Sequence, residues 1–164
     1  MRHASHAPCV TLSNGTVRFD VEDHAEARDV ADQLARDLET LLAVPDCPPV
    51  PDEVSFTIVR DAEMSALHER FTGDASTTDV MSFETAHDAA GRVIEGDVVV
   101  CLDVAIRESV AHGVTVRNEL LLYALHGLLH LSGFDDLTPD DHARMHEAED
   151  SWLESAGFGR VFRP

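Results

Sequence analysis

The sequence of 164 residues contains no lysine, and all 12 of its basic residues are arginines. With 31 acidic residues, the formal net charge is −19. A surface this acidic repels polyanions, so a protein that coats nucleic acid non-specifically is excluded. The charge does not exclude an enzyme that binds a few phosphates locally.

The sequence also lacks the marks of secreted and membrane proteins. Its three cysteines, Cys9, Cys47 and Cys101, are widely spaced and form no CxxC pair. This indicates neither a disulfide framework nor a thiolate metal site, and we expect Cys101 to be a small core residue. There is no signal core and no stretch near the ~20 apolar residues of a membrane span. We therefore expect a soluble, cytoplasmic protein with no membrane partner.

Length and composition are typical of one globular domain. A chain of 164 residues with 44% hydrophobic and 26% charged residues can bury a substantial core. It has no internal repeat and no low-complexity linker. We expect residues 1–8 to be disordered and residues 9–164 to form a single domain.

Hydrophobic patterning predicts strands and helices in mixed order. Strands are expected at 10–12, 17–21, 54–59, 78–83 and 97–102, and helices at 23–44, 61–71, 104–111, 116–131 and 139–156. Asp61 is expected to cap the second helix, and Thr138 to cap the last, with Pro139 at its first position. The predicted class is α+β, with a small mixed sheet packed against helices.

The fourth predicted helix carries two histidines in an almost wholly apolar setting, which predicts burial on most of its faces. His126 and His130 are four residues apart, so their side chains lie on one face about one turn apart. Gly133 fits a left-handed helix stop, and Asp135 and Asp136 follow it. Two imidazoles at this spacing, with a third ligand after a chain reversal, are typical of a catalytic metal site with one open position.

The alternative is that both histidines are ordinary core residues, but their chelating spacing and the carboxylates that follow favour metal binding. Gly127 lies between them, at a cost to the helix of about 1 kcal/mol relative to alanine. We therefore expect close approach of another backbone or a substrate at this position. Zinc proteases with the H-E-x-x-H motif have their general base here, so glycine argues against that peptidase chemistry.

Several segments resemble one known family. The run HGLLHLSGFDD, from His126 to Asp136, resembles the H-G-x-L-H-L-x-G-[YF]-D-H signature of the YbeY metal-dependent endoribonucleases. TDVMSF at 78–83, GDVVV at 96–100 and EL at 119–120 resemble the family's T-D-V-L-S-F, G-D-I-V-I and E-L. These segments occur in family order, and the resemblance covers roughly residues 54–155.

The resemblance implies a single-strand-specific, metal-dependent endoribonuclease with a zincin-like metal helix. Such an enzyme acts in 16S rRNA 3′-end maturation and ribosome quality control, and hydrolyses RNA phosphodiesters with a metal-bound water. One divalent ion per chain, most simply zinc, is implied at His126, His130 and Asp136. The implied partners are single-stranded or ribosomal RNA and the ribosome or its small subunit, with no DNA expected.

The chain departs from the family pattern at two positions. The family's third ligand is usually histidine, whereas this chain has Asp136; two histidines and a carboxylate suit zinc and also ferrous iron. The family's arginine falls at Thr72 here, and Arg70 is the candidate replacement as a phosphate clamp, or else a solvated helix arginine. Asp135 is the candidate general base, or else a turn former.

Three further residues are open to two interpretations. His142 and His146 lie one turn apart on the last helix, among Asp140, Asp141, Glu147, Glu149 and Asp150. We interpret this helix as exposed and the two histidines as surface residues, not a second metal pair. Glu119, two turns before His126, either orients a ligand or favours the helix start.

Two other classes of function remain open. One is a ribosome-assembly or binding factor whose metal is structural and which has little catalysis, favoured by the missing arginine and the charge of −19. The other is a metal-dependent hydrolase of a small substrate. The charge itself is expected to concentrate in the first and last helices, away from the metal helix.

Overall fold

The computed structural model describes residues 9–12, 15–21, 25–45 and 47–160. The disorder expected for residues 1–8 lies outside this range. The strands are β1 (Cys9–Leu12), β2 (Gly15–Val21), β3 (Glu53–Val59), β4 (Val80–His87) and β5 (Val93–Cys101). The helices are α1 (Ala25–Leu42), α2 (Asp61–Thr72), α3 (Leu102–His112), α4 (Val116–Leu131) and α5 (Pro139–Ser155).

The strands form one mixed sheet in the order β1-β2-β3-β5-β4. The three central strands β2, β3 and β5 run parallel, while β1 and β4 pair antiparallel at the two edges. Parallel neighbours need crossover connections; α1 lies between β2 and β3, and α2 and β4 lie between β3 and β5. The predicted α+β class with a small mixed sheet is confirmed.

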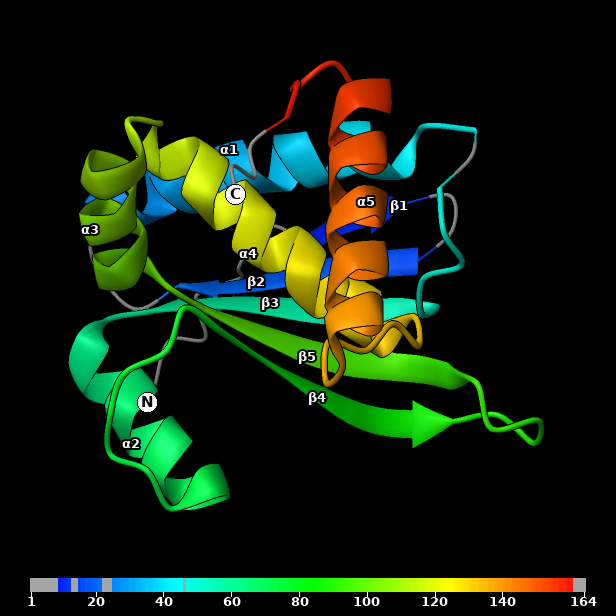
Figure 1. The fold of residues 1–164 in the computed structure, drawn as a ribbon, viewed down its shortest axis with the longest axis horizontal. Helices are drawn as coiled ribbons and strands as arrows, with labels where there is room; N and C mark the ends of the chain where they lie inside the picture. Colours follow the sequence, from blue (N-terminus) through cyan, green and yellow to red (C-terminus); the bar gives the residue numbers. More distant parts are fainter. Residues whose placement is uncertain (1–8, 13–14, 22–24, 46, 161–164) are drawn as a thin grey trace, which may run out of the picture.

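The helices cover the two faces of this sheet unequally (Figure 1). α1, α4 and α5 lie on one face, with α3 beside α4, whereas α2 lies on the other. Alternation along β5 divides its side chains accordingly: Val98 and Val100 join the main core, and Val99 and Cys101 join a small cluster with Met64 of α2. α4 crosses the middle of the larger layer, which is why nearly all its faces are buried. Within the described residues, no helix is long and apolar enough to cross a bilayer.

Glycine permits α4 to approach the sheet closely. A Cβ atom built on Gly127 would lie 2.6 Å from Cγ1 of Val98 and 3.3 Å from Cγ2 of Val80. Position 127 therefore does require a small residue, but the partners are side chains of β5 and β4. The expectation of another backbone or a substrate at this point was wrong.

The starts of α5 and α2 test the two helix caps that were predicted from the local sequence. Thr138 Oγ1 accepts the backbone N–H of Asp141 at 3.1 Å and caps α5, as predicted. Asp61 does not cap α2; it is the first helical residue, after Arg60 at the cap position. Its carboxylate instead accepts two hydrogen bonds from Arg107 of α3, at 2.6 and 3.0 Å. A partner so far along the chain leaves no signal in the local sequence.

Candidate metal centre

The fold brings together the three residues that the sequence predicted as ligands. Donor atoms of His126, His130 and Asp136 all lie within 4.8 Å of one another. The two Nε2 atoms are 3.0 Å apart, and Nε2 of His126 lies 3.8 Å from Oδ2 of Asp136. The two imidazoles are half-buried, and the side chain of Asp136 is more exposed, at 37% against 22% for His126. This set could hold a metal ion.

A tight reversal after α4 carries the carboxylate back to the imidazoles. Gly133 has a left-handed φ of 91°, and the N–H of Phe134 donates to the carbonyl of Leu129 at 3.0 Å. Asp135 then stabilises the turn, because its Oδ1 accepts the backbone N–H groups of Asp136 and Leu137 at 2.8 and 3.3 Å. These contacts match the turn-forming alternative for Asp135, whose role as general base stays a prediction.

Hydrogen bonds fix the tautomers of both histidines. Nδ1 of His130 lies 3.2 Å from the carbonyl oxygen of Phe134, and Nδ1 of His126 lies 2.7 Å from Oε1 of Glu149. Both oxygens act as acceptors, so the proton of each neutral ring sits on Nδ1 and the lone pair on Nε2. Two lone pairs that face each other at 3.0 Å repel unless a proton or a metal ion lies between them. The donor chemistry therefore fits a metal ion.

The surroundings of His126 favour positive charge. Burial lowers the pKa of its ring, but the hydrogen bond and charge of Glu149, with the charges of Asp79 and Asp136, outweigh that effect. The net pKa of His126 is raised above its ordinary value. The same negative groups that hold a proton here would stabilise a divalent cation.

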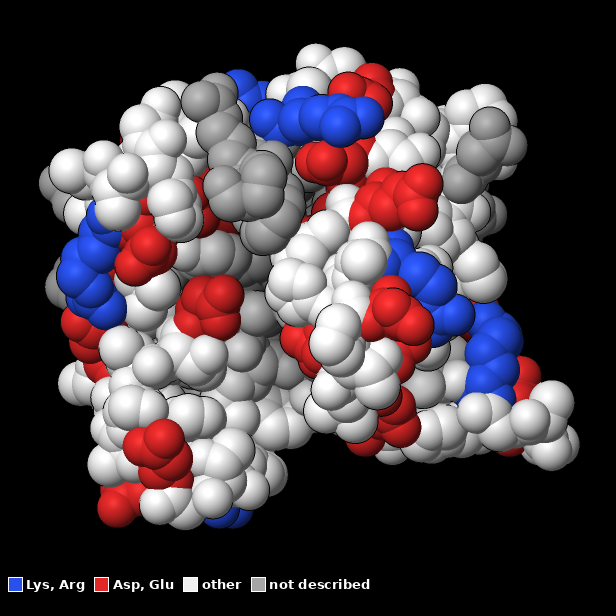
Figure 2. Space-filling model, viewed as in Figure 1, with Lys and Arg blue, Asp and Glu red and all other residues white. Residues whose placement is uncertain are grey.

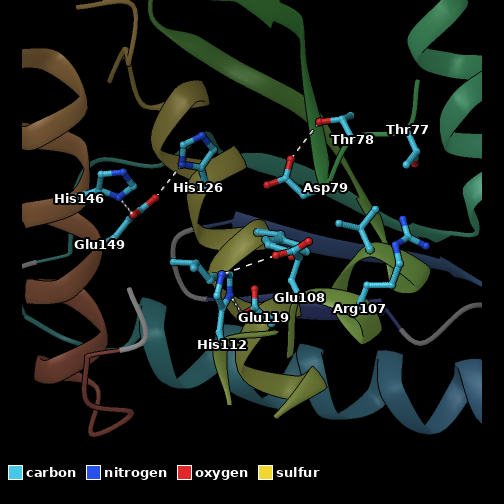
Figure 3. Close-up of a pocket in the computed structure, with 13 residues that line it drawn as sticks. Thr77, Thr78, Asp79, Arg107, Glu108, His112, Glu119, His126, His146 and Glu149 are labelled. Atoms are coloured by element: carbon cyan, nitrogen blue, oxygen red, sulfur yellow. Dashed lines mark hydrogen bonds and ion pairs between the residues drawn. The ribbon is translucent and has the colours of Figure 1, made fainter. Parts of the chain in front are cut away.

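Glu149 is the residue that organises this centre from outside the ligand set. Its side chain extends from α5 and is only 1% exposed. One oxygen binds His126, and the other lies 2.6 Å from Nδ1 of His146 (Figure 3). A buried carboxylate on the far nitrogen of a ligating histidine fixes the ring's orientation and raises its basicity.

The interpretation of α5 as an exposed helix was therefore wrong for the side that faces the core, where Met145, Glu149, Trp152 and Leu153 are buried. Glu149 is buried, and His146 is half-buried, whereas His142 is exposed as expected. The signal that could have found Glu149 is its place on the helix, because it shares a face with buried Met145 and Trp152. A carboxylate on the apolar face of an amphipathic helix needs a partner.

A cavity of about 500 Å³ opens beside the centre (Figure 3). His126 and His146 both line it, as do four carboxylates and one arginine; these are Asp79, Glu108, Glu119, Glu149 and Arg107. The expectation that acidic residues lie away from the metal helix is thus wrong here. The helix itself carries no acid from 120 to 131, but its first turn and its neighbouring elements supply four. Such a cavity attracts cations.

Glu119 has a different partner from the one weighed in the sequence. Its buried carboxylate, in the first turn of α4, lies 2.9 Å from Nδ1 of His112 at the end of α3. The hydrogen bond with Glu119 raises the pKa of His112, and burial together with Glu119 raises the pKa of Tyr123. Glu119 thus links α3 to α4, and its place in the first turn matches the helix-start alternative.

Arg70 lies away from this cavity. It is exposed on α2, across the sheet from α4, and its guanidinium stacks 5.6 Å from the ring centroid of Phe71. The arginine that lines the cavity is Arg107, which sequence reasoning did not single out. On the face in Figure 2, arginines form small separate groups among acidic ones, and there is no continuous basic track.

The comparisons with known proteins agree with this architecture. The family model described as Endoribonuclease YbeY matches residues 13–157. The chain belongs to the YbeY family. Relatives named Endoribonuclease YbeY include one from Thermobifida fusca, 37% identical over 115 residues, which are 66% of this chain and 73% of that protein. Another, from Frankia alni, is 36% identical over 63% of this chain and 62% of its own length.

A solved structure of low sequence identity shares the fold. The solution structure of TM1509 from Thermotoga maritima superposes with a TM-score of 0.59 and 22% identity. The match covers 85% of this chain and 88% of that one. The YbeY member described here therefore has the same arrangement of sheet and helices as that protein.

Proposed function

We propose that this YbeY-family chain is a single-strand-specific, metal-dependent endoribonuclease that acts in 16S rRNA 3′-end maturation and ribosome quality control. The observation that carries the proposal is the pair of facing Nε2 lone pairs of His126 and His130, with Asp136 beside them. The name of the relatives, Endoribonuclease YbeY, supports RNA as the substrate. The proposal includes a cytoplasmic location and the ribosome or its small subunit as partner.

The residues of the chain prepare the site before any substrate arrives. His126, His130 and Asp136 would hold one divalent ion, most simply zinc, and three protein ligands leave a position open. Such an ion polarises a phosphoryl oxygen and lowers the pKa of water. Glu149 holds His126 as the Nδ1–H tautomer, and the reversal at Gly133 brings the carboxylate into place.

The charges that line the cavity support strict metal dependence of the proposed activity. A cavity with four carboxylates and one guanidinium repels the phosphates of RNA until a cation is bound beside it. Arg107 is the one arginine of the described cavity lining, and its planar group suits a phosphate. A phosphate there would compete with Asp61, which the guanidinium already binds at 2.6 and 3.0 Å. We propose that Arg107 contacts the RNA backbone, the role that the sequence assigned to Arg70.

Chelation and metal add-back test the proposed activity. Metal-free protein should not cleave a single-stranded RNA, and zinc or ferrous ion should restore cleavage. Asp136→Ala should lose more than about 100-fold in rate, beyond the 10–100-fold typical of residues outside the ligand set. Asp140→Ala, at an exposed aspartate at the start of α5, is the matched control. Duplex RNA and single-stranded DNA should remain uncut.

Absence of cleavage with every ion would overturn the catalytic proposal. If chelation also unfolded the protein, the assembly-factor alternative with a structural metal would replace it. For the phosphate contact, Arg107→Ala should weaken RNA binding uniformly and reduce the salt slope by about 1, with exposed Arg144→Ala as control. If Arg70→Ala has that effect and Arg107→Ala has none, the RNA lies over α2.

A further inference from the structure

The molecule contains a second histidine pair with nearly the same geometry as the first. On α5, the Nε2 atoms of His142 and His146 are 2.9 Å apart, and the ring planes make an angle of 78°. On α4, the corresponding values for His126 and His130 are 3.0 Å and 85°. In both pairs the rings are one helical turn apart and present their outer nitrogens to each other.

Glu149 prepares one histidine of each pair for metal binding. Because its Oε2 lies 2.6 Å from Nδ1 of His146, that nitrogen carries the ring proton and Nε2 keeps its lone pair. Its Oε1 does the same for His126. One buried carboxylate therefore fixes two histidines as Nε2 ligands, and the lone pair of His146 points at His142.

The electrostatic surroundings of the second pair favour a cation. His146 lines the acidic cavity, and α5 itself carries Asp140, Asp141, Glu147 and Asp150. The guanidinium of Arg144, on the same helix, is bound to Asp141 at 2.6 Å and so offsets one of these acids. His142 is exposed, which leaves room for water in further coordination positions.

We propose that His142 and His146 form a second divalent-metal site, separate from the centre on α4. Two imidazole nitrogens and water suit zinc or copper(II). Among the described residues, no third histidine, cysteine or carboxylate donor lies within 4.8 Å of both facing nitrogens, so this site binds metal more weakly than the centre on α4. The inference does not depend on the proposed nuclease activity, because metal binding alone defines it.

Zinc stoichiometry tests this proposal. Metal-free protein is dialysed against buffered zinc, the bound metal is measured, and histidine ring nitrogens are followed by NMR. The native chain should bind two equivalents, and His142→Asn should bind one and lose the metal-induced shift of Nε2 in His146. His87→Asn, at an exposed histidine paired with Glu84 at 2.9 Å, should keep both.

The outcomes separate the two sites. Equal zinc content in the native chain and His142→Asn, with an unshifted His146 ring in both, would overturn the proposal. In Asp136→Ala, the equivalent on α5 should persist. If the native chain binds zinc only through His142 and His146, the proposed nuclease centre fails while this inference stands. A thermal unfolding scan of each variant confirms that the fold is retained.

Discussion

The two histidine pairs share their spacing but differ in their surroundings. The pair on α4 lies on a helix packed against the sheet, and both of its histidines have Nδ1 bound to an oxygen acceptor. The pair on α5 lies at the edge of the cavity, with one half-buried and one exposed histidine. Within the described residues, only the α4 pair gathers a third histidine, cysteine or carboxylate donor within 4.8 Å. Helical spacing creates a pair of facing imidazoles, whereas the reversal after the helix adds a third donor group beside one of the pairs.

Glu149→Gln should have the largest effect on metal binding, because Glu149 contacts one histidine of each pair. An amide has one acceptor oxygen where the carboxylate has two, so Nδ1 of His126 or of His146 loses the acceptor that Glu149 supplies. We expect zinc affinity at the α4 centre to fall by about 10–100-fold. Competition with a chromogenic chelator measures this. Glu147→Gln, at an exposed glutamate of the same helix, is the matched control.

If Glu149→Gln binds zinc as tightly as the native chain, Glu149 merely fills space in the core. In that case the two pairs are independent of each other. If affinity falls at only one pair, the amide oxygen has turned to the other, and the NMR signals of the two rings identify which one kept its bond.

Gly127→Ala should affect the α4 pair alone, through the packing of its helix. The added methyl group meets Val98 at 2.6 Å, and this short branched side chain cannot move aside. Overpacking costs about 1–3 kcal/mol, and the gain of about 1 kcal/mol in helix propensity offsets part of it. We expect the free energy of unfolding in urea to fall by about 1 kcal/mol.

Ser151→Ala, at an exposed position of α5, is the control for this substitution and should stay within about 0.5 kcal/mol. An increase in stability for Gly127→Ala would show that α4 can move away from β5. Zinc affinity measured on the same variant would then show whether that movement separates the ligands.

The fold was largely predictable because each element carries its own periodic signal. Every predicted helix and strand is present, and the errors lie at ends that depend on a neighbour. β4 continues to His87, beyond the predicted end at 83. The extension forms because His87 pairs with Val93 of β5. α3 begins directly after β5, at Leu102, because the core receives that side chain as the strand ends.

The clustering of His126, His130 and Asp136 was predictable because the three residues lie within one short segment, whereas Glu149 contacts His126 from 23 residues away. Counting acids on α5 hid the fact that this one lies on the apolar face. Asp37 follows the same rule on α1, where it is buried and binds Arg117 of α4 at 2.6 Å. A single charge on the buried face of a predicted helix therefore indicates a distant partner.

The smallest expected effect concerns a third pairing of histidine with a buried glutamate, that of His112 with Glu119. The hydrogen bond to Glu119, with its charge and that of Glu108, outweighs desolvation and raises the pKa of His112. A raised folded-state pKa stabilises the protein below the unfolded value of about 6.5, and this contribution is lost as the pH rises through the folded pKa. His112→Asn should therefore destabilise the metal-free protein more at about pH 5 than at about pH 9. Urea unfolding with chelator present measures the free energy of unfolding at the two pH values. When Glu119→Gln is already present, His112→Asn should have the same effect at both. If His112→Asn lowers the free energy of unfolding equally at both pH values, the contribution of His112 to stability does not depend on the charge of Glu119. His112 would then differ from His126 and His146, whose metal binding is expected to depend on Glu149.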